Sequence, residues 1–163
     1  MIDAYLQIEG IPGESTAKGY EKQIEIVDFS HNVHQSTDIS ASSSGGATTG
    51  RTTHSDFTVT KQIDLASPVL AQRCCDGSHI PKIALTVLRA GGQGKQVPFL
   101  VVTLTNVVVS DVAYGGQKES LPTETVSFNY GKIEWVYTQQ KRADGGGGGN
   151  TTGSWNLETN AAE

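Results

Sequence analysis

The sequence predicts a mainly β protein: a β-barrel of two antiparallel sheets with one short flanking α-helix and a long extended loop. Two patterns predict this fold class. Most apolar residues alternate with polar ones over short runs, as in strands that bury one face. A single segment carries helix-capping residues, and one helix among many strands is typical of a barrel or sandwich with a helix on its flank. A length of 163 residues fits one domain, which we expect over residues 1–163.

The first long β-prone run covers Ile24–Val33. Its apolar residues occupy even positions at Ile24 and Ile26 and odd positions from Val27 onward. Such a change of phase within one strand predicts a bulge. After the change, one polar face of the strand is shared by Asp28, Ser30, Asn32 and His34.

Further strands are expected over Asp56–Ile63, Lys82–Leu88, Val97–Val112 and Glu124–Gln140. The Val97–Val112 run is apolar on both faces, so we expect the core on one side and a helix or another subunit on the other. In Glu124–Gln140 the apolar phase flips at Gly131. This flip predicts a bulge or corner of the kind that allows a barrel to close.

Two segments depart from the strand pattern. Residues 35–53 contain one large apolar residue, Ile39, so they cannot form core and are expected to be a long loop that is functional or disordered. Residues 143–154 are rich in glycine and are predicted to be a flexible linker. Trp155 and Leu157 follow this linker and are expected to dock as a short edge strand.

The helix is expected over Ser67–Asp76. Ser67 fits the N-cap, and Pro68 fits the first helical position, where a missing N–H has no cost. Gly77 fits the position just past the end of the helix.

Charge and hydropathy exclude several classes of partner. The formal net charge is −5 and no run of Lys and Arg is present, whereas nucleic acids and anionic membranes require clustered cations. No apolar run approaches the ~20 residues of a membrane span. The N-terminal segment lacks the cationic start and apolar core of a signal peptide. We therefore expect synthesis and folding in the cytoplasm, and any export without a cleaved signal.

No metal site or other cofactor is expected. Cys74, Cys75 and His79 lie close in sequence, and His54 could join them. Structural zinc sites, however, space their cysteines two to four residues apart, and adjacent side chains on a helix diverge by ~100°. We instead expect Cys74 to be a small apolar residue on the core side and Cys75 to be partly exposed.

No catalytic site is expected either. The chain lacks a Gly-x-Ser-x-Gly elbow, and a pair formed by Cys75 and His79 has no family signature around it. Glu124 and Glu134 are expected on solvated strand faces and not as a sugar-cleaving carboxylate pair. Apolar surface without internal cover then favours contact between subunits, and contact between unlike patches gives a ring or a filament.

The central block of the sequence resembles the Hcp family, the haemolysin-coregulated proteins that form the inner tube of type VI secretion systems. The family pattern is matched by Thr60, Lys61, Asp64, Ser67, Pro68, Leu70, Gly77, His79, Ile80 and Pro81. The opening segment resembles the first strand and Gly-Glu-Ser turn of that family, at residues 13–15. A second block over residues 104–137, together with Trp155 and Asn156, resembles its later strands. Residues 35–53 and the polyglycine segment depart from the family.

The resemblance implies a barrel with one flanking helix, hexameric rings and a hollow tube of stacked rings that a contracting sheath drives out of the cell. It implies four kinds of partner: further copies of the chain, a trimeric spike protein, sheath proteins and small effectors carried in the lumen. It implies a structural protein that is not an enzyme and that needs no cofactor.

Three sets of candidate residues follow from this resemblance. The candidates for lining the lumen and binding effectors are Asp28, Ser30, Asn32 and His34. The candidates for contact between rings are Asp38, Ile39, Ser43, Gly46 and Arg51. The candidates for contact within a ring lie on the helix and are Val69, Arg73 and Cys75.

Two other functions stay open at this point. A monomeric secreted effector with enzymatic activity would depend on Cys75 or His79. A small monomeric β-rich module that binds carbohydrate would need exposed aromatic residues on one face.

Overall fold

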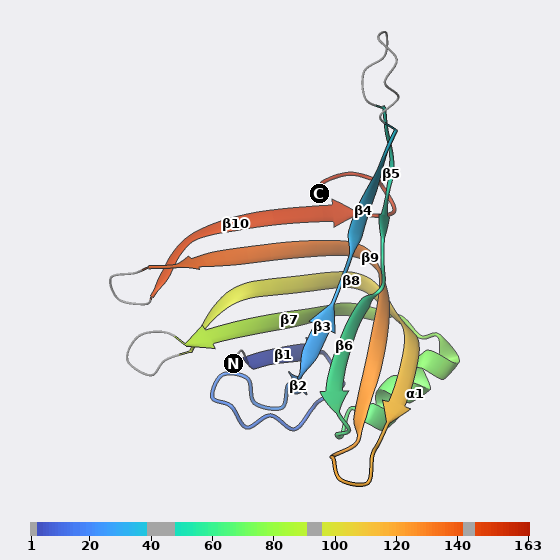
Figure 1. Cartoon of the computed structure of the whole chain (residues 1–163), viewed down its shortest axis with the longest axis vertical. Helices are drawn as coiled ribbons and strands as arrows, with labels where there is room; N and C mark the ends of the chain where they lie inside the picture. Colours follow the sequence, from blue (N-terminus) through green and yellow to red (C-terminus); the bar gives the residue numbers. More distant parts are fainter. Residues whose placement is uncertain (1–2, 39–47, 91–95, 142–145) are drawn as a thin grey trace.

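A computed structural model of the chain confirms a mainly β barrel with one short helix on its flank (Figure 1). The structure describes residues 3–38, 48–90, 96–141 and 146–163. Its strands and helix are, in chain order, β1 (Asp3–Ile8), β2 (Ile24–Ile26), β3 (Asp28–Ser30), β4 (Val33–Asp38), β5 (Thr48–His54), β6 (Phe57–Gln62), α1 (Ser67–Asp76), β7 (Ile80–Ala90), β8 (Gln96–Gly115), β9 (Thr123–Gln140) and β10 (Gly147–Asn156).

The two antiparallel layers expected from the sequence are two parts of one eight-stranded sheet. Its strand order is β2-β1-β7-β8-β9-β6-β3, and β10 pairs with β9 outside this path. The sheet stays continuous because β8 and β9 are long and pair with each other from Leu100↔Tyr137 to Gly115↔Thr123 while they curve (Figure 1). The two ends of the sheet thereby come to face each other.

The segment Ile24–Ser30 closes the barrel. Its first half, β2, pairs with β1 at one end of the sheet path, and its second half, β3, pairs with β6 at the other end. Between the two strands, the N–H of Val27 donates to the carbonyl oxygen of Thr60 at 2.8 Å, and the Val27 side chain is exposed. The predicted change of phase at Val27 is confirmed, but it marks a strand that changes its pairing partner and not a bulge.

The predicted corner at Gly131 is confirmed. Tyr130 and Ile133 are both buried, so the buried face of β9 moves from even to odd positions across Gly131. Next to it in β8, Asn106 has a φ of 55°, a left-handed conformation that asparagine adopts more readily than most residues. A Cβ atom at position 131 would lie 3.3 Å from Cβ of Asn106 and 2.9 Å from Oε1 of the flexible Glu158 side chain, so glycine keeps this corner free of crowding.

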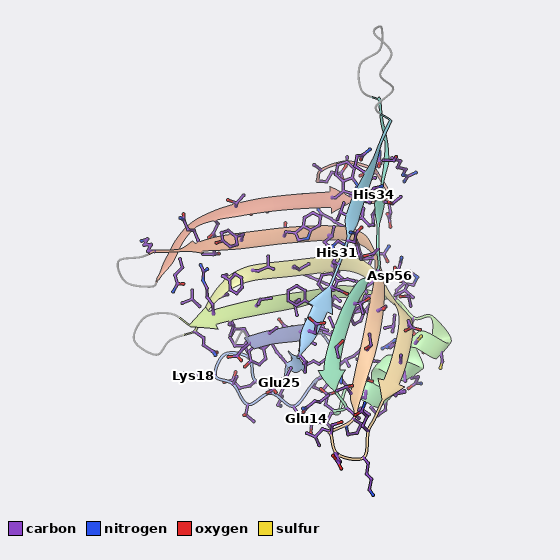
Figure 2. All side chains as sticks on the ribbon, viewed as in Figure 1. Glu14, Lys18, Glu25, His31, His34 and Asp56 are labelled. Atoms are coloured by element: carbon purple, nitrogen blue, oxygen red, sulfur yellow. The ribbon has the colours of Figure 1, made fainter. Side chains whose placement is uncertain are left out.

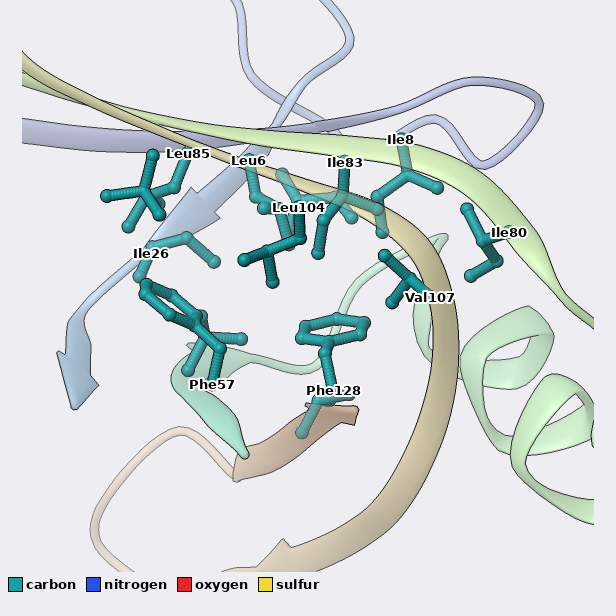
Figure 3. Packing of buried hydrophobic residues seen from close by; sticks show 14 of the residues in the cluster. Leu6, Ile8, Ile26, Phe57, Ile80, Ile83, Leu85, Leu104, Val107 and Phe128 are labelled. Carbon is teal, nitrogen blue, oxygen red and sulfur yellow. The ribbon is translucent and has the colours of Figure 1, made fainter. Parts of the chain in front are cut away.

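The hydrophobic core fills the space between the curved halves of the sheet (Figure 3). Leu6 of β1, Ile83 of β7 and Leu104 of β8 come from one part of the wall. They face Phe57 of β6 and Phe128 of β9 from the other part. Each such side chain contributes roughly 1.5–3 kcal/mol when it is fully buried, so this cluster is the main source of stability.

The strand β8 is buried on one face along part of its length. Val102, Leu104 and Val107 are buried in the core, and α1, whose Leu70 belongs to the same core cluster, packs against the strand. Val101 points to the opposite face, where it is half-buried and lines an open depression beside Thr86. Another subunit therefore remains the expected cover for this outer part of β8.

The helix α1 has the predicted bounds, and its predicted C-terminal cap is confirmed. Gly77 is left-handed, with a φ of 66°, and its N–H donates to the carbonyl oxygen of Arg73 at 3.0 Å. The prediction that Ser67 is the N-cap is wrong, because Ala66 occupies that position without a capping side chain. The Ser67 hydroxyl points inward and donates to Oε1 of Glu124 at 2.6 Å.

Residues 35–53 were expected to be one long loop, and this prediction is wrong at both ends. Residues 35–38 belong to β4 and residues 48–53 belong to β5, and the two strands form an antiparallel hairpin. Strands rich in Ser and Thr can pair in this way because the hydrogen bonds come from the backbone and need no core. The middle of the segment, residues 39–47, lies outside the described residues.

Residues 143–154 were expected to be a linker, and from Gly147 onward this prediction is wrong. These residues form most of β10, which runs antiparallel to β9. A Cβ atom at Gly148 would lie 2.8 Å from the carbonyl oxygen of Gln139, so the missing side chain allows the two strands to approach. The expected edge strand is confirmed at Trp155, whereas Leu157 lies in the turn that follows β10.

Candidate functional site

The hairpin of β4 and β5, which we call the arm (Val33–Asp38 and Thr48–His54), extends away from the barrel (Figure 1). Val33 pairs with His54 at its base, and Gln35 pairs with Thr52 further out. His34, Gln35 and Val33 are exposed, and Val33 is an apolar side chain with 47% of its surface accessible. An ordered hairpin with no core of its own presents most of its surface to a partner.

The base of the arm is attached to the barrel through one tyrosine hydroxyl. Nε2 of His31, just before β4, lies 2.6 Å from Oη of Tyr130 on β9. Nδ1 of His54, the last residue of β5, lies 3.0 Å from the same oxygen. The His31 ring also packs against Phe57 and Trp135, with centroid distances of 5.5 and 6.2 Å. We call His31, His54 and Tyr130 the anchor cluster.

Burial changes the acid–base properties of the anchor cluster. It raises the pKa of Tyr130 above its ordinary value, and the nearby Asp56 carboxylate raises it further. Burial lowers the pKa of His31, and the neighbouring His54 lowers it further. Burial also lowers the pKa of His54. Around neutral pH these shifts favour uncharged imidazoles and an uncharged phenol.

A groove of about 330 Å³ lies where the arm meets the end of β10. Val33 and His54 line it from the arm, and Trp135, Trp155 and Gly153 line it from β9 and β10. Gly153 lies over the Trp135 ring, where a Cβ atom would make an ordinary contact of 3.8 Å with Cε3 of that ring. The groove is therefore a mainly apolar hollow beside the anchor cluster.

The four lumen candidates are all exposed, but they do not lie on one strand. Asp28 and Ser30 belong to β3 and flank Phe29, which packs against the core. Asn32 lies between strands, where its N–H donates to Oγ of Ser55 at 2.9 Å. His34 belongs to the arm (Figure 2). The expected single polar face is thus divided between the barrel wall and the arm, because the chain leaves the wall after Ser30.

The loop candidates are divided in the same way. Asp38 ends β4 and pairs with Thr48 of β5. Arg51 lies on β5, and its Nη2 donates to the carbonyl oxygen of Leu157 at 3.1 Å. This bond links the arm to the chain segment after β10. Ile39, Ser43 and Gly46 lie outside the described residues.

The helix candidates differ in exposure. Val69 is half-buried and packs against the core, and Arg73 is half-buried in the last turn. Cys75 is exposed, whereas Cys74 packs partly against the core, as expected. Of the three candidates, Cys75 is the one that leaves most of its surface available to a neighbour.

A buried polar cluster that was not predicted from the sequence joins β6, α1 and β9. Nζ of Lys61 lies 2.5 Å from Oε1 of Glu124 and 2.7 Å from Oδ1 of Asp64. Lys61 also donates to the Ser67 hydroxyl at 3.0 Å. The expectation that Glu124 lies on a solvated face is wrong, because Glu124 is 1% exposed. The alternation itself carried the signal: Glu124 shares its phase with the buried Val126.

His79, which the sequence offered for metal binding or catalysis, lies in a polar contact with β8. Nδ1 of His79 lies 2.9 Å from Oδ1 of Asn106. In the described parts of the chain, no group of three or more His, Cys, Asp or Glu side chains is placed to hold a metal ion. None of the helices described is long and apolar enough to cross a membrane.

Sequence comparisons point to one family. The family model described as "Type VI secretion system effector, Hcp" matches residues 5–137. The chain is 34% identical to "Protein hcp1" of Pseudomonas aeruginosa over 160 residues, which cover 98% of this chain and 97% of that protein. It is 26% identical to the "Major exported protein" of the same organism, over 84% of this chain and 81% of that protein.

Solved structures agree with these relatives. One described as "Structure of a type six secretion system protein" superposes with a TM-score of 0.92 at 29% identity, and covers 100% of both chains. The crystal structure of Hcp1 from Salmonella typhimurium superposes with a TM-score of 0.80 at 26% identity, and covers 99% of both chains. The whole described fold, including the arm, falls within these alignments.

Proposed function

This chain belongs to the Hcp family of type VI secretion systems, and we propose that it forms hexameric rings that stack into the hollow inner tube. The tube is secreted with effectors in its lumen, and the protein acts as a structural subunit without enzymatic activity. The observation that carries the proposal is the arm, an ordered hairpin that leaves the barrel and exposes its side chains. A surface of this kind gains stability only through a neighbour.

Exposed apolar side chains at the other end of the barrel support stacking. Val27 and Ile63, with exposed fractions of 67% and 45%, line a hollow beside Glu14 and Glu25. Figure 2 places Glu14 and Glu25 at the end of the barrel opposite His34 of the arm. Two unlike ends that meet head to tail produce an open stack and not a closed dimer. We propose that the arm of one ring contacts this opposite end of the next ring.

We assign the arm residues Asp38 and Arg51 to contact between rings, together with Ile39, Ser43 and Gly46 of the segment between them. We assign the helix residues Val69, Arg73 and Cys75, and the half-buried outer face of β8, to contact within a ring. A helix that already packs on β8 would then be covered from outside by the next subunit.

We assign Asp28 and Ser30 to the wall of the lumen, where exposed polar side chains leave a cargo protein free to slide. Asn32 and His34 lie where the chain passes from the wall into the arm, so we assign them to the rim of the lumen. The remaining partners are a trimeric spike at the end of the tube and sheath proteins around it. We propose cytoplasmic assembly followed by export without a cleaved signal peptide.

Light scattering coupled to size-exclusion chromatography tests the proposal. A hexameric ring of this 17.3 kDa chain has a mass of about 100 kDa. Negative-stain electron microscopy should show annular particles in the same fraction and stacked rings at higher concentration. A single species at the mass of the monomer, without annular particles at any concentration, would contradict the proposal. It would instead favour a monomeric effector or binding module.

A further inference from the structure

We propose that the anchor cluster of His31, His54 and Tyr130 is a pH-sensitive attachment that holds the arm against the barrel at neutral pH and loosens it on acidification. Its consequence for the tube rests on the proposed function, in which the arm contacts the next ring. Acidification would then weaken ring stacking through the subunit itself and without any further protein.

The geometry ties both strands of the arm to one atom. His31 precedes β4 by two positions, and His54 is the last residue of β5. Their ring nitrogens lie 2.6 and 3.0 Å from Oη of Tyr130, whose side chain is buried in β9 at 5% exposure. The orientation of the base of the arm therefore depends on this one hydroxyl and its two partners, while the bond from Arg51 to Leu157 holds the arm further out.

Hydrogen-bond accounting makes the neutral state the satisfied one. A phenol donates one hydrogen and accepts others, and a neutral imidazole has one donor nitrogen and one acceptor nitrogen. With both imidazoles neutral, one accepts the hydrogen of Tyr130 and the other donates to its oxygen. With His31 and His54 both protonated, each nitrogen is a donor and the phenol hydrogen loses its partner. Two cations would then also face each other with ring centroids 6.0 Å apart.

The surroundings of the cluster do not offset this penalty. Asp56 acts electrostatically on Tyr130, but its carboxylate already accepts from Oγ of Ser110 at 2.6 Å and from Nδ2 of Asn129 at 3.0 Å. Other charged or titratable side chains near this level lie on the arm, on β8, on β9 and in the segment after β10. They are His34, Arg51, Asp111, Lys132, Glu134 and Glu158. Lys132 and Glu134 flank the buried Ile133 on β9, and neither of them is itself buried. Arg51 and Glu158 have partners of their own in Leu157 and Asn106.

The sign of the effect follows from the direction of the histidine shifts. Both histidines have pKa values below 6.5 in the folded chain, with burial as the main cause. Docking of the arm is therefore most favourable above pH 6.5, where the histidines are neutral whether the arm is docked or undocked. It loses stability as the pH falls from there through the lowered pKa values, because the undocked state binds protons first.

The remaining contacts at the base of the arm do not titrate. The N–H of Ser55 donates to the carbonyl oxygen of Asn32 at 2.9 Å, and the N–H of Asn32 donates to Oγ of Ser55 at 2.9 Å. These bonds hold the two chain segments at the base of the arm together at any pH. Acidification is thus expected to free the arm without unfolding the barrel.

Amide hydrogen exchange of the full chain at pH 7.5 and pH 5.5, corrected for the intrinsic rate, tests the inference. Protection of β4 and β5 should fall by up to about tenfold per pH unit for each proton taken up, while protection of β7 and β8 stays constant. The double variant His31→Asn/His54→Asn removes both titrating groups and should abolish this difference. The matched control His34→Asn, on the exposed arm outside the cluster, should retain it.

Equal arm protection at both pH values in the native chain would overturn the inference, as would an unchanged pH dependence in the double variant. If the double variant does not fold, titration of the His31 and His54 imidazole resonances by NMR decides instead. Ordinary pKa values near 6.5 for both histidines would overturn the inference. Lowered pKa values, together with arm resonances that change over the same pH range, would support it. Ring and tube formation is scored separately by electron microscopy, so a chain without rings but with a pH-dependent arm refutes only the proposed function.

Discussion

Nζ of Lys61 lies 2.5 Å from Oε1 of Glu124, and neither side chain is accessible to solvent. The pair joins β6 to β9, and Ser67 ties the start of α1 to the same carboxylate. Oε2 of Glu124 is buried without a hydrogen-bond partner. A buried charge that loses its partner costs about 3–5 kcal/mol, whereas replacing both charges by apolar groups is often neutral. The two charges therefore depend on each other, and losing one of them costs more than replacing both.

The single variant Lys61→Met should lower the free energy of unfolding by about 3–5 kcal/mol, because Glu124 is left buried and unpaired. The double variant Lys61→Met/Glu124→Leu should recover most of that loss. Urea unfolding followed by tryptophan fluorescence measures both, with the exposed Lys118→Met as a control expected within about 0.5 kcal/mol of the native chain. A double variant that is no more stable than Lys61→Met alone would contradict a coupled pair.

Gly13 should not tolerate alanine. A Cβ atom there would lie 2.5 Å from the carbonyl oxygen of Gln23 and 2.6 Å from Cα of Ile24, and both are backbone atoms beside β2. We expect Gly13→Ala to lower the free energy of unfolding by about 1–3 kcal/mol, as overpacking does. Gly116→Ala is the matched control, because its Cβ would make an ordinary contact of 3.5 Å with Pro122. Thermal unfolding compares the two, and equal effects would refute the steric argument.

Shortening the arm should separate ring formation from stacking. Gln35 and Thr52 are paired, so joining them through Asn-Gly, a dipeptide suited to a two-residue hairpin turn, keeps the base of the arm and the anchor cluster. Light scattering should still find rings, while electron microscopy should find few stacks of rings. Tubes of normal length from the shortened chain would show that the arm is not the stacking contact.

A bulky residue on the wall should change cargo binding and leave assembly intact. Ser30 is exposed on β3, so Ser30→Trp adds volume to the proposed lumen without filling the core. Co-purification of an effector from the same secretion system with the ring measures retention. The control Ser120→Trp places the same side chain on an exposed turn between β8 and β9, away from the wall. Equal retention in both variants and the native ring would argue against a lumen position for Ser30.

The features that the sequence predicted correctly are those with a local physical signature. The roles of Gly77 and Gly131 were predicted because glycine is common at helix ends and at corners of strands. The bounds of α1 were predicted from Pro68 and Gly77. The change of phase at Val27 was also visible. The structural cause of this change was not visible, because a switch of pairing partner from β1 to β6 depends on which strands lie beside the segment in the fold. Residue patterns along one chain carry no information about that.

The features that were missed depend on contacts between distant parts of the chain. Residues 147–154 read as a linker because glycine weakens a strand in isolation, yet their backbone pairs with β9 and the glycines permit the close approach. The anchor cluster joins residues separated by 99 and 76 positions. Nothing in the sequence around His31 or His54 signals Tyr130. The burial of Glu124 could have been predicted, because it continues the apolar phase of β9.

The segment Ile24–Ser30 also sets an order of events while the chain folds. It joins β1 to β6, and these strands belong to one sheet only through β7, β8 and β9. Both of its pairings are short in sequence, since Ala4 pairs with Ile26 and Asp28 pairs with Thr60. The pairing of β6 with β9, as in Thr60 with Thr125, closes a much longer loop, so the cylinder is expected to close there last. Until β9 has emerged from the ribosome, a nascent subunit exposes two unpaired sheet edges, at which it can associate with other chains.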